Sequence, residues 1–209
     1  MEGMRETQRS VPNTIEPLAD DVLDFRPVGQ QELKLAAGLL GEVGSAKVRP
    51  KAFVAKWDAA RKGSDVVLSG GDATAYRCTA RGWGAVLGTQ AVGTGRCVFN
   101  FRIDHLQVNT VVGVALPDVR LNEGVSKRNV VLKESGELTA WGERVAQLIG
   151  FEPGDVIRFQ VDFSTRTIAI FRNGEQRPEA TVGGISATPL RPFAAFGDVN
   201  SSVTLVTQD

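Results

Sequence analysis

The stretch from Phe151 to Glu175 decides the fold, and it reads FEPGDVIRFQVDFSTRTIAIFRNGE. Ile157, Phe159 and Val161 alternate with polar residues, which is the period of a strand with one buried face. The segment 164–166 predicts a chain reversal, so that the apolar residues after it return beside the first strand. The Asn-Gly pair that follows tolerates positive φ and predicts a second tight turn. The stretch therefore predicts an antiparallel meander.

The same kind of sequence pattern continues from Val48 to the end of the chain. Short apolar runs recur between glycine, proline or polar clusters, as in a sandwich or a jelly roll. The expected strands are Ala52–Trp57, Asp65–Ser69, Ala73–Cys78, Gly84–Leu87, Arg96–Ile103, Thr110–Ala115, Val130–Leu132, Val156–Phe163, Thr167–Phe171, Leu190–Phe196 and Ser202–Val206. We predict an all-β domain over residues 50–209, built as a two-sheet antiparallel β-sandwich.

Residues 1–49 have a different character. Three prolines before residue 30 exclude a continuous helix there. Only Gln30–Leu40 has the i, i+3, i+4, i+7 spacing of an amphipathic helix, with a glycine available to end it. We expect an N-terminal extension with one short helix. Its acidic and apolar segment 16–25 either docks on a partner, packs back on its own domain or stays disordered.

Composition and charge exclude several classes of protein. The chain has 209 residues, with 24 Lys and Arg against 24 Asp and Glu, so no global field favours nucleic acid or an anionic membrane. No apolar run is long enough for a membrane helix, and the N-terminus lacks the apolar core of a secretion signal. Cys78 and Cys97 are interpreted as buried free thiols in a reducing compartment. We expect an intracellular, cytoplasmic protein.

No catalytic or metal-binding signature is present in the sequence. His105 is the only histidine, and no nucleophile stands near it at a recognised spacing, so we interpret it as a surface residue. Asp155 and Asp162 are seven positions apart and face opposite sides of one strand. We expect Asp155 to shape a turn instead. The glycines of segment 41–47 lack the spacing of a phosphate loop. We predict a non-enzymatic protein with no cofactor and no metal.

One basic stretch, residues 47–62, keeps a nucleic-acid alternative open. It carries six positive charges, with Trp57 available for stacking. These cations are Lys47, Arg49, Lys51, Lys56, Arg61 and Lys62. An acidic peptide would use the same charges, and a solvated edge around the domain entry is the third interpretation.

A series of motifs, in order along the chain, resembles those of the SPRY family. They are WD at 57–58 with DVVLSGG at 65–71, GWGAVLG at 82–88, GRCVFNFRI at 95–103, VGVA at 112–115, GDVI at 154–157, VDF at 161–163, FRNGE at 171–175, LRPF at 190–193 and SVTL at 202–205. Asn100 stands where family members usually carry glutamate. The resemblance covers about residues 50–207. It implies a concanavalin-like jelly roll of two packed sheets, whose loops at one end bind short peptide segments of partner proteins.

The resemblance also implies site residues. Peptide-binding SPRY adaptors use a basic residue after the opening tryptophan, the loop before the "GRY" strand and an aromatic before the last strand. In this chain those positions resemble Arg61 or Lys62, Thr94 and Phe196. Segment 91–94 has no aromatic where those adaptors carry tyrosine, so their Asn-rich peptide specificity is not carried over.

Further binding candidates come from residue type and loop length. Trp83 is either core or contact, and Trp141 lies either at the rim of a binding face or as a cap on the sandwich. The long charged loop 117–128 either carries specificity or varies as ordinary surface. The candidates outside the resembled positions are Trp83, Asp118, Arg120, Trp141 and Asp198.

We therefore predict a non-enzymatic protein–protein interaction module: an adaptor, a scaffold or a small subunit of a larger complex. It would capture a partner peptide or surface with the loops at one end of the sandwich, with no membrane contact. The alternative is a nucleic-acid-associated subunit of an RNA–protein complex that uses residues 47–62. A lectin-like ligand site rests on fold analogy alone.

Overall fold

The computed structural model describes residues 56–79, 82–185 and 188–207, and the side chains of 177–179 lie outside this description. By internal contacts the chain divides into Met1–Lys47 and Val48–Asp209, and the described residues all belong to the second unit. The expected helix at Gln30–Leu40 and most of the expected strand at Ala52–Trp57 lie outside them. Every regular element in the described residues is a β-strand.

The first sheet contains seven antiparallel strands in the order β1-β4-β13-β6-β7-β8-β9. Their bounds are β1 Trp57–Lys62, β4 Gly84–Gly88, β6 Thr110–Ala115, β7 Asn129–Lys133, β8 Glu137–Ala140, β9 Glu143–Gln147 and β13 Arg191–Phe196. β4, β13, β6 and β7 form its centre, while β1 and β9 are its edges.

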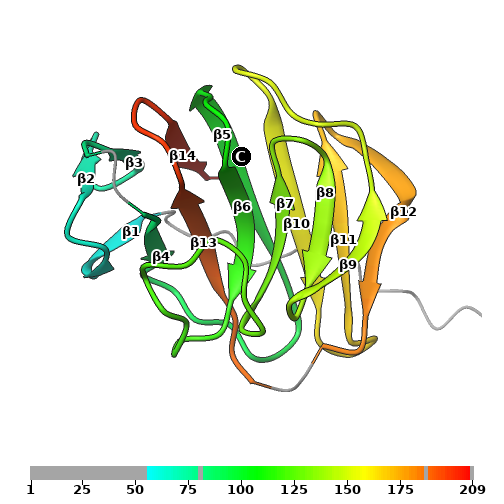
Figure 1. Ribbon diagram of the computed structural model, residues 1–209. Helices are drawn as coiled ribbons and strands as arrows, with labels where there is room; N and C mark the ends of the chain where they lie inside the picture. Colours follow the sequence, from blue (N-terminus) through cyan, green and yellow to red (C-terminus); the bar gives the residue numbers. More distant parts are fainter. Residues whose placement is uncertain (1–55, 80–81, 186–187, 208–209) are drawn as a thin grey trace, which may run out of the picture. The chain divides into compact units, whose positions relative to one another are not determined.

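The second sheet also contains seven antiparallel strands, in the order β12-β11-β10-β5-β14-β3-β2. Their bounds are β2 Val66–Ser69, β3 Thr74–Arg77, β5 Arg96–His105, β10 Val156–Asp162, β11 Thr167–Arg172, β12 Glu175–Gly183 and β14 Ser202–Val206. Figure 1 shows β9 and β12, one edge of each sheet, side by side at one side of the sandwich, with β1 and β2 at the other. The predicted two-sheet antiparallel sandwich is confirmed.

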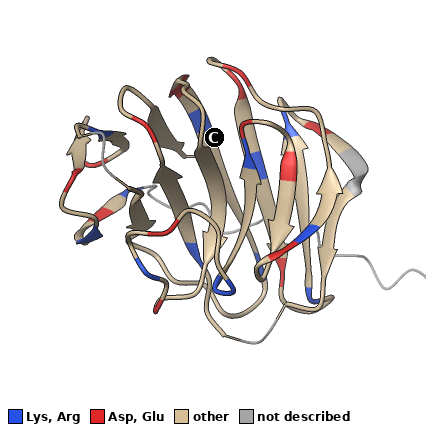
Figure 2. Ribbon diagram, in the orientation of Figure 1, with Lys and Arg blue, Asp and Glu red and all other residues tan. Residues whose placement is uncertain are grey.

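Charged residues lie mainly on loops, strand ends and the outward faces of strands. Figure 2 shows Lys and Arg interspersed with Asp and Glu over the sandwich rather than gathered by sign. Several form ion pairs, among them Arg77 with Asp65 at 2.9 Å and Arg172 with Asp155 at 2.8 Å. Positive and negative side chains are therefore balanced locally on the described residues, as they are in the composition of the chain.

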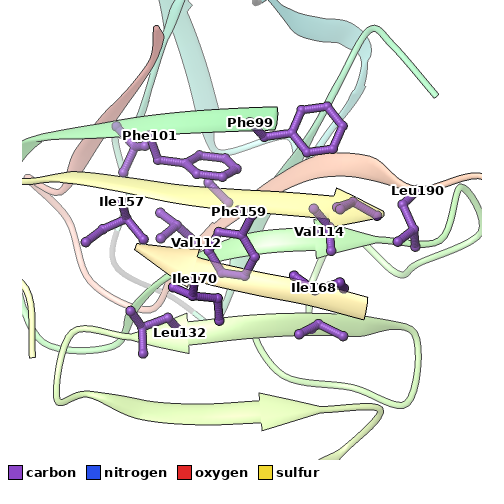
Figure 3. Packing of buried hydrophobic residues seen from close by; sticks show 14 of the residues in the cluster. Phe99, Phe101, Val112, Val114, Leu132, Ile157, Phe159, Ile168, Ile170 and Leu190 are labelled. Carbon is purple, nitrogen blue, oxygen red and sulfur yellow. The ribbon is translucent and has the colours of Figure 1, made fainter. Parts of the chain in front are cut away.

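The inner core fills the space between the two sheets. β10 contributes Ile157, Phe159 and Val161, all fully buried, as the alternation of the sequence predicts. Phe159 meets Phe101 of β5 edge to face, with ring centroids 5.8 Å apart. Figure 3 shows Phe159 beside Val112 of the opposite sheet. Interlocking aromatic and branched side chains of this kind supply most of the burial that stabilises a sandwich.

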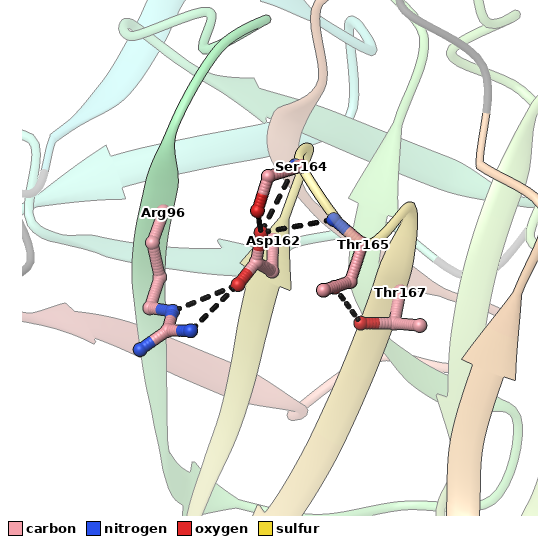
Figure 4. Close-up of polar contacts among 5 residues, drawn as sticks. All are labelled: Arg96, Asp162, Ser164, Thr165 and Thr167. Atoms are coloured by element: carbon pink, nitrogen blue, oxygen red, sulfur yellow. Dashed lines mark hydrogen bonds and ion pairs between the residues drawn. The ribbon is translucent and has the colours of Figure 1, made fainter. Parts of the chain in front are cut away.

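The predicted hairpin between β10 and β11 is present, and Asp162 organises its turn (Figure 4). Its Oδ1 accepts hydrogen bonds from the Ser164 hydroxyl at 2.5 Å and from the Ser164 and Thr165 backbone N–H groups. Arg96 donates to Oδ2 from Nε at 3.0 Å and from Nη2 at 2.7 Å. The Ser164 hydroxyl and the Arg96 guanidinium hold the pKa of Asp162 far below its usual range.

Asp155 shapes the turn that leads into β10, as the sequence predicts. Its carboxylate accepts the Glu152 backbone N–H at 2.7 Å and the Asn173 amide at 2.7 Å, and it pairs with Arg172. Burial acts to raise the pKa of Asp155, but these hydrogen bonds and the Arg172 charge outweigh it and lower the pKa.

A second apolar cluster lies on the outer face of the first sheet. It contains Ala85, Leu87, Val111, Ala115, Val119, Val131, Phe193 and Ala195, and we call it the outer cluster. β4, β6 and β13 are therefore buried on both faces, since each also contributes to the inner core, with Val86, with Val112 and Val114, and with Ala194 and Phe196 respectively. This double burial explains why these strands read as continuous apolar runs instead of alternating ones.

Candidate functional site

The segment 116–128, which we call the cover loop, shields the outer cluster. It leaves the end of β6 and returns to the start of β7, and the Leu116 N–H donates to the Arg128 carbonyl at 2.8 Å. Its far part reaches β4, where the Ala85 N–H donates to the Leu121 carbonyl at 2.9 Å. Val119, Leu121 and Val125 pack on the outer cluster. The loop is thus fixed to the sheet at both ends of its path.

Asn129, the first residue of β7, fixes the distal part of the cover loop. Its buried amide donates to the Gly124 carbonyl at 2.9 Å, and its side-chain oxygen accepts the Ser126 N–H at 3.0 Å. A buried amide that satisfies both its donor and acceptor in this way gives the loop one defined conformation.

Trp83 lies against the cover loop between two hollows. The first, of about 520 Å³, is lined by Gly63, Ser64, Asp65, Thr79, Leu121 and Asn122 together with the indole. The second, of about 310 Å³, is lined by Asn109, Asn122, Glu123, Gly124, Val125 and Lys133. Trp83 and Asn122 border both hollows, and the indole is half-buried. We call these two hollows with Trp83 the Trp83 site.

Gly124 permits the close approach of loop and indole. A Cβ atom at this position would lie 2.4 Å from the Trp83 ring. No side chain other than hydrogen therefore fits at residue 124 without moving either the ring or the loop. The orientation of Trp83 thus depends on the loop as well as on β4.

Arg77 ties together the segments behind Trp83. Its side chain is fully buried, and Nε donates to Asp65 at 2.9 Å. Its Nη1 donates to the carbonyls of Gly82 at 2.6 Å, Phe196 at 3.0 Å and Gly197 at 2.5 Å. A planar guanidinium is suited to holding several acceptors in fixed directions. It therefore locks the segment before Trp83 to the end of β13.

The polar groups around the second hollow are largely paired with one another. Lys133 forms an ion pair with Glu137 at 2.5 Å, and the hydrogen bond from Lys133 is the main reason that the pKa of Glu137 is lowered. Glu123 pairs with Arg120 at 3.3 Å. Asn109, at φ +59°, donates to Asp198 at 3.3 Å. The site therefore presents amides and an aromatic ring rather than an uncompensated charge.

Several predicted residues gather around this site. Trp83 is its centre, Asp198 is bonded to Asn109, and Arg120 is bonded to Glu123. Asp118 belongs to the cover loop, where it pairs with Arg128 at 3.1 Å. Arg61 donates to the Pro117 carbonyl at the start of that loop. The predicted loop and the predicted Trp83 thus belong to one surface.

Phe196 does not act as the exposed aromatic that the resemblance implies. It is 0% exposed and belongs to the inner core, in register with Thr110 and Gly84. The expectation of a partner-anchoring ring at this position is wrong, because a ring with no accessible surface cannot contact a peptide. The neighbouring residue Gly197 lies at the site instead, where its N–H donates to the Asn109 carbonyl at 2.7 Å.

Thr94 and Trp141 lie away from the Trp83 site. Thr94 is exposed just before the start of β5. The chain that leaves β13 after Phe196 enters the second sheet again at Ser202, opposite His105 at the other end of β5. Ten strand residues, roughly 30 Å, separate these two ends. Trp141, half-buried at φ +55°, packs on the inner core, which favours the cap among its two interpretations.

Lys62 is engaged in a local contact. It ends β1, and its ammonium group donates to the Val66 carbonyl at 2.7 Å. Of the basic stretch 47–62, only Lys56, Arg61 and Lys62 lie within the described residues. Two of these three cations are therefore satisfied by backbone carbonyls.

Sequence reasoning did not single out Arg77, Asn109, Asn122 or Gly124. An arginine in an expected strand and asparagines in polar loops are common, and their convergence depends on how β3, β5–β6 and the cover loop meet in space. Trp83 and the length of the cover loop were the signals that pointed to the region. The glycine within a charged loop gave a further indication.

The remaining reactive groups do not gather into a metal centre in the described residues. His105 is exposed, as predicted. Cys78 is exposed and Cys97 buried, so the expectation of two buried thiols is wrong for Cys78, which lies just past the end of β3. Burial raises the pKa of Cys97 to about 12. No cluster of three or more His, Cys, Asp or Glu side chains that would hold a metal occurs among residues 56–79, 82–185 and 188–207.

No helix within the part of the chain described by the structure has the length and hydropathy needed to cross a membrane.

Comparison with solved structures finds the same fold. The SPRY domain of human HERC1 matches with a TM-score of 0.65 and 23% identity, over 73% of this chain and 98% of that one. The TRIM65 PSpry domain matches with a TM-score of 0.61 and 17% identity, over 74% of this chain and 92% of that one. A human SPRY domain matches with a TM-score of 0.54 and 16% identity, over 69% of this chain and 95% of that one.

Among curated proteins, none matches the chain by sequence. The family model described as "SPRY domain" matches residues 96–209, more than half of the chain, from the start of β5 onward. This match agrees with the motifs, the two seven-stranded sheets and the structural neighbours. The chain belongs to the SPRY domain family.

Proposed function

We propose that this protein is an intracellular interaction module that binds a peptide segment of a partner protein at the Trp83 site. SPRY domains are in general protein-interaction modules, which sets the class of function. The proposed location of the binding site rests on the half-buried indole of Trp83, which is flanked by two hollows of about 520 and 310 Å³. Aromatic side chains that are rigidly held and partly accessible are the residues that most often dominate binding energy.

The chemistry of the hollows favours an uncharged, extended peptide. Asn109 and Asn122 line the second hollow, and Asn122 lines the first as well. Side-chain amides both donate and accept, which suits recognition of a peptide backbone. The indole offers a flat apolar surface for an aliphatic or aromatic side chain of the partner. The charged groups nearby are paired internally, so they shape the rim more than they attract charge.

The cover loop and Arg77 make the site rigid before a partner arrives. The loop is fixed by backbone bonds to β4 and by the Asn129 amide, and Arg77 holds the segment before Trp83. A preorganised site loses less conformational entropy on binding. We therefore expect recognition with little rearrangement of the domain.

Selection from a random library of displayed peptides on the immobilised chain tests this function. A selected peptide is then titrated, by fluorescence polarisation, against the wild type and the Trp83→Ala variant. Truncating an aromatic hot spot costs about 2 kcal/mol or more, so we expect at least a roughly 30-fold weaker Kd.

Trp141→Ala is the matched control, because Trp141 is also a half-buried tryptophan but packs on the inner core away from this site. We expect it to leave the Kd unchanged at a temperature where both variants are folded by circular dichroism. Loss of binding in Trp141→Ala with retention in Trp83→Ala would place the site elsewhere.

We propose further that residues 1–49 add a second contact with the same partner, which would make the chain an adaptor or a subunit of a larger assembly. Two linked contacts raise the effective affinity without a new site on the sandwich. The full partner protein should then bind the whole chain more tightly than a chain lacking residues 1–49, whereas the short selected peptide should bind both equally. Equal affinity for the full partner would remove this part of the proposal.

The nucleic-acid alternative receives no support from the described residues. Arg61 and Lys62 donate to the carbonyls of Pro117 and Val66. Binding to nucleic acid would fall steeply as salt is raised, because phosphate contacts release counterions. Capture of an uncharged peptide would not, so the salt dependence of binding separates the two.

A further inference from the structure

A second surface, far from Trp83 in strand order, lies on the side of the sandwich where β9 and β12 meet. An apolar slot of about 300 Å³ opens there. We call it the edge slot. Its lining includes Leu132, Leu148, Ile149, Ile170, Glu175 and Ala180. Leu132 belongs to the first sheet and Ile170 and Ala180 to the second, so the slot leads between the two layers.

The slot connects the solvent with the inner core. Leu132, Ile170 and Ala180 are members of that core and are almost fully buried. Ile149, at the mouth, is 64% exposed. These three side chains form the floor of the slot, and the apolar surface that a partner's side chain can cover belongs to Ile149 and the half-buried Leu148.

One exposed large apolar residue lies at this mouth, and a second lies in the edge strand that precedes it. Within the described residues, the exposed large hydrophobic side chains are Val108, Val145 and Ile149. Val145 is 50% exposed and lies in β9, four residues before Ile149. Apolar residues that gather at one place on a surface mark interaction sites more often than scattered ones do.

The edge strand beside the slot has backbone groups to offer. β9 is the last strand of its sheet and pairs only with β8 among the described strands. Val145 is the extra residue of a bulge, since Leu138 pairs with Ala146 and Thr139 with Arg144. The bulge twists this part of the edge away from strand addition, so an extended segment would pair only with the part of β9 outside the bulge.

Charge at the mouth indicates which segment fits. Glu175 lines the slot with an exposed carboxylate, and Glu143 is exposed at the start of β9. Arg172, also at the mouth, is paired with Asp155 and donates to the Gly150 carbonyl. The Arg172 cation is thus occupied. The exposed Arg144 beside Glu143 donates to Gln147 and offsets the Glu143 charge, so Glu175 is the carboxylate that the slot itself presents. A basic side chain on the partner would complement Glu175.

We propose that the edge slot binds an extended segment of a partner protein in which an apolar residue is flanked by basic ones. The apolar side chain packs on Leu148 and Ile149 at the mouth of the slot, and a Lys or Arg beside it meets Glu175. This contact is separate from the Trp83 site, so the module holds two chain segments at once. The two sites can be tested independently.

The probes are two matched peptides, acetyl-KVLVK-amide and acetyl-EVLVE-amide, titrated into the isotope-labelled full chain by NMR. We expect saturable shifts of the Val145, Ile149 and Glu175 amides with the basic peptide, and at least roughly fivefold weaker binding of the acidic one at low salt. Glu175→Lys should reverse the preference, because it inverts the charge at the mouth without entering the core.

Ile149→Asp should weaken the basic peptide at least about tenfold by placing a charge where the apolar contact forms. Val108→Asp is the matched control, since Val108 is equally exposed but lies outside the slot; it should change nothing. Equal binding of the two peptides, or shifts confined to other residues, would overturn the proposal. Self-association of the chain that Ile149→Asp abolishes, without any peptide shift, would also overturn it in favour of a second copy as occupant.

Discussion

The outer faces of the two sheets differ, although both sheets contain seven antiparallel strands. On the first sheet the outer face is apolar, with Leu87 and Phe193 fully buried under the cover loop. On the second it is polar, and no loop of this kind covers it among the described residues: Arg158 bonds to Asn100 across the strands, and Thr204 bonds to Asp104 at 2.5 Å. The first sheet is therefore a middle layer between the inner core and the cover loop, whereas the second sheet presents a polar outer face.

This difference explains where a recognition surface forms. Cross-strand polar pairs satisfy themselves on the second sheet and leave little to bind. The apolar outer face of the first sheet needs a cover, and the cover brings loop residues 122–125 against Trp83. A long loop held on a rigid sheet is a common place for function. The proposed Trp83 site is thus a consequence of covering the outer cluster.

The largest expected effect tests whether the outer cluster is packed as tightly as the inner core. Phe193 of the outer cluster and Phe159 of the inner core are both 0% exposed. Truncation of either to alanine should lower the free energy of unfolding by about 4 kcal/mol, since each leaves a large cavity. Urea denaturation measures both. A loss below about 1 kcal/mol for Phe193→Ala alone would show that the cover loop opens and that the face is not a core.

The next largest effect is expected at Arg77, which links the covered sheet to β3 of the other sheet. Arg77→Met should cost about 3 kcal/mol, because Asp65 and three carbonyls lose a buried donor. The selected peptide should also bind more weakly, because the segment before Trp83 is no longer fixed. Arg102→Met is the matched control: its partner Asp104 also accepts from Thr204, and its side chain is half exposed. A cost equal to that of Arg77→Met would contradict the special role of Arg77.

A smaller effect tests the contact between loop and indole. Gly124→Ala would place its Cβ atom 2.4 Å from the Trp83 ring, so we expect a loss of about 2 kcal/mol and a changed tryptophan fluorescence spectrum. Gly183→Ala places its Cβ atom with nothing within 4 Å and has no positive φ, so it controls for an added methyl group without crowding. If Gly124→Ala bound the peptide as the wild type does while Gly183→Ala bound it more weakly, the proposed role of the contact between loop and indole would be wrong.

The smallest effect concerns Asp162, in a turn that belongs to the second sheet alone. Its pKa in the folded state is lowered by the Ser164 hydroxyl and Arg96, so its contribution is complete above the unfolded pKa of about 3.9 and is lost as pH falls below that value. Asp162→Asn should cost about 1.5 kcal/mol at pH 7 and less at pH 3. Urea titrations at the two pH values measure this. A cost that grows toward acid would reverse the sign and contradict the assignment.

Much of the fold could be predicted from sequence because its central hairpins follow clear patterns. The expected strands at Thr110–Ala115 and Ser202–Val206 coincide with β6 and β14, and the meander from 156 to 172 is present. β8, β9 and β12 were not among the expected strands, and the first strand was expected at Ala52–Trp57, whereas β1 spans Trp57–Lys62. β1, β9 and β12 are edge strands, and β12 contains Pro178, which an edge tolerates. β9 is mostly exposed and has no buried face to give a periodicity, and the four residues of β8 are too few to show one.

The candidate site could be predicted only in part, for a related reason. Trp83 and the long charged loop indicated the surface on which we propose the site, but β13 is buried on both faces, so nothing in its residues showed that Phe196 points inward. Asn109, Asn122 and Arg77 come from different parts of the chain, and only the packing of the sheets brings them together. Residue type alone cannot show such convergence.

Hydrogen–deuterium exchange with the selected peptide bound tests most directly whether recognition takes place on the covered sheet. The account predicts slower exchange at Trp83, Asn109 and residues 121–125, and unchanged exchange at Arg102, Arg158 and Thr204 on the outer face of the second sheet. Slower exchange on the second sheet, or at the opposite end near Thr94, with none at the cover loop, would contradict it.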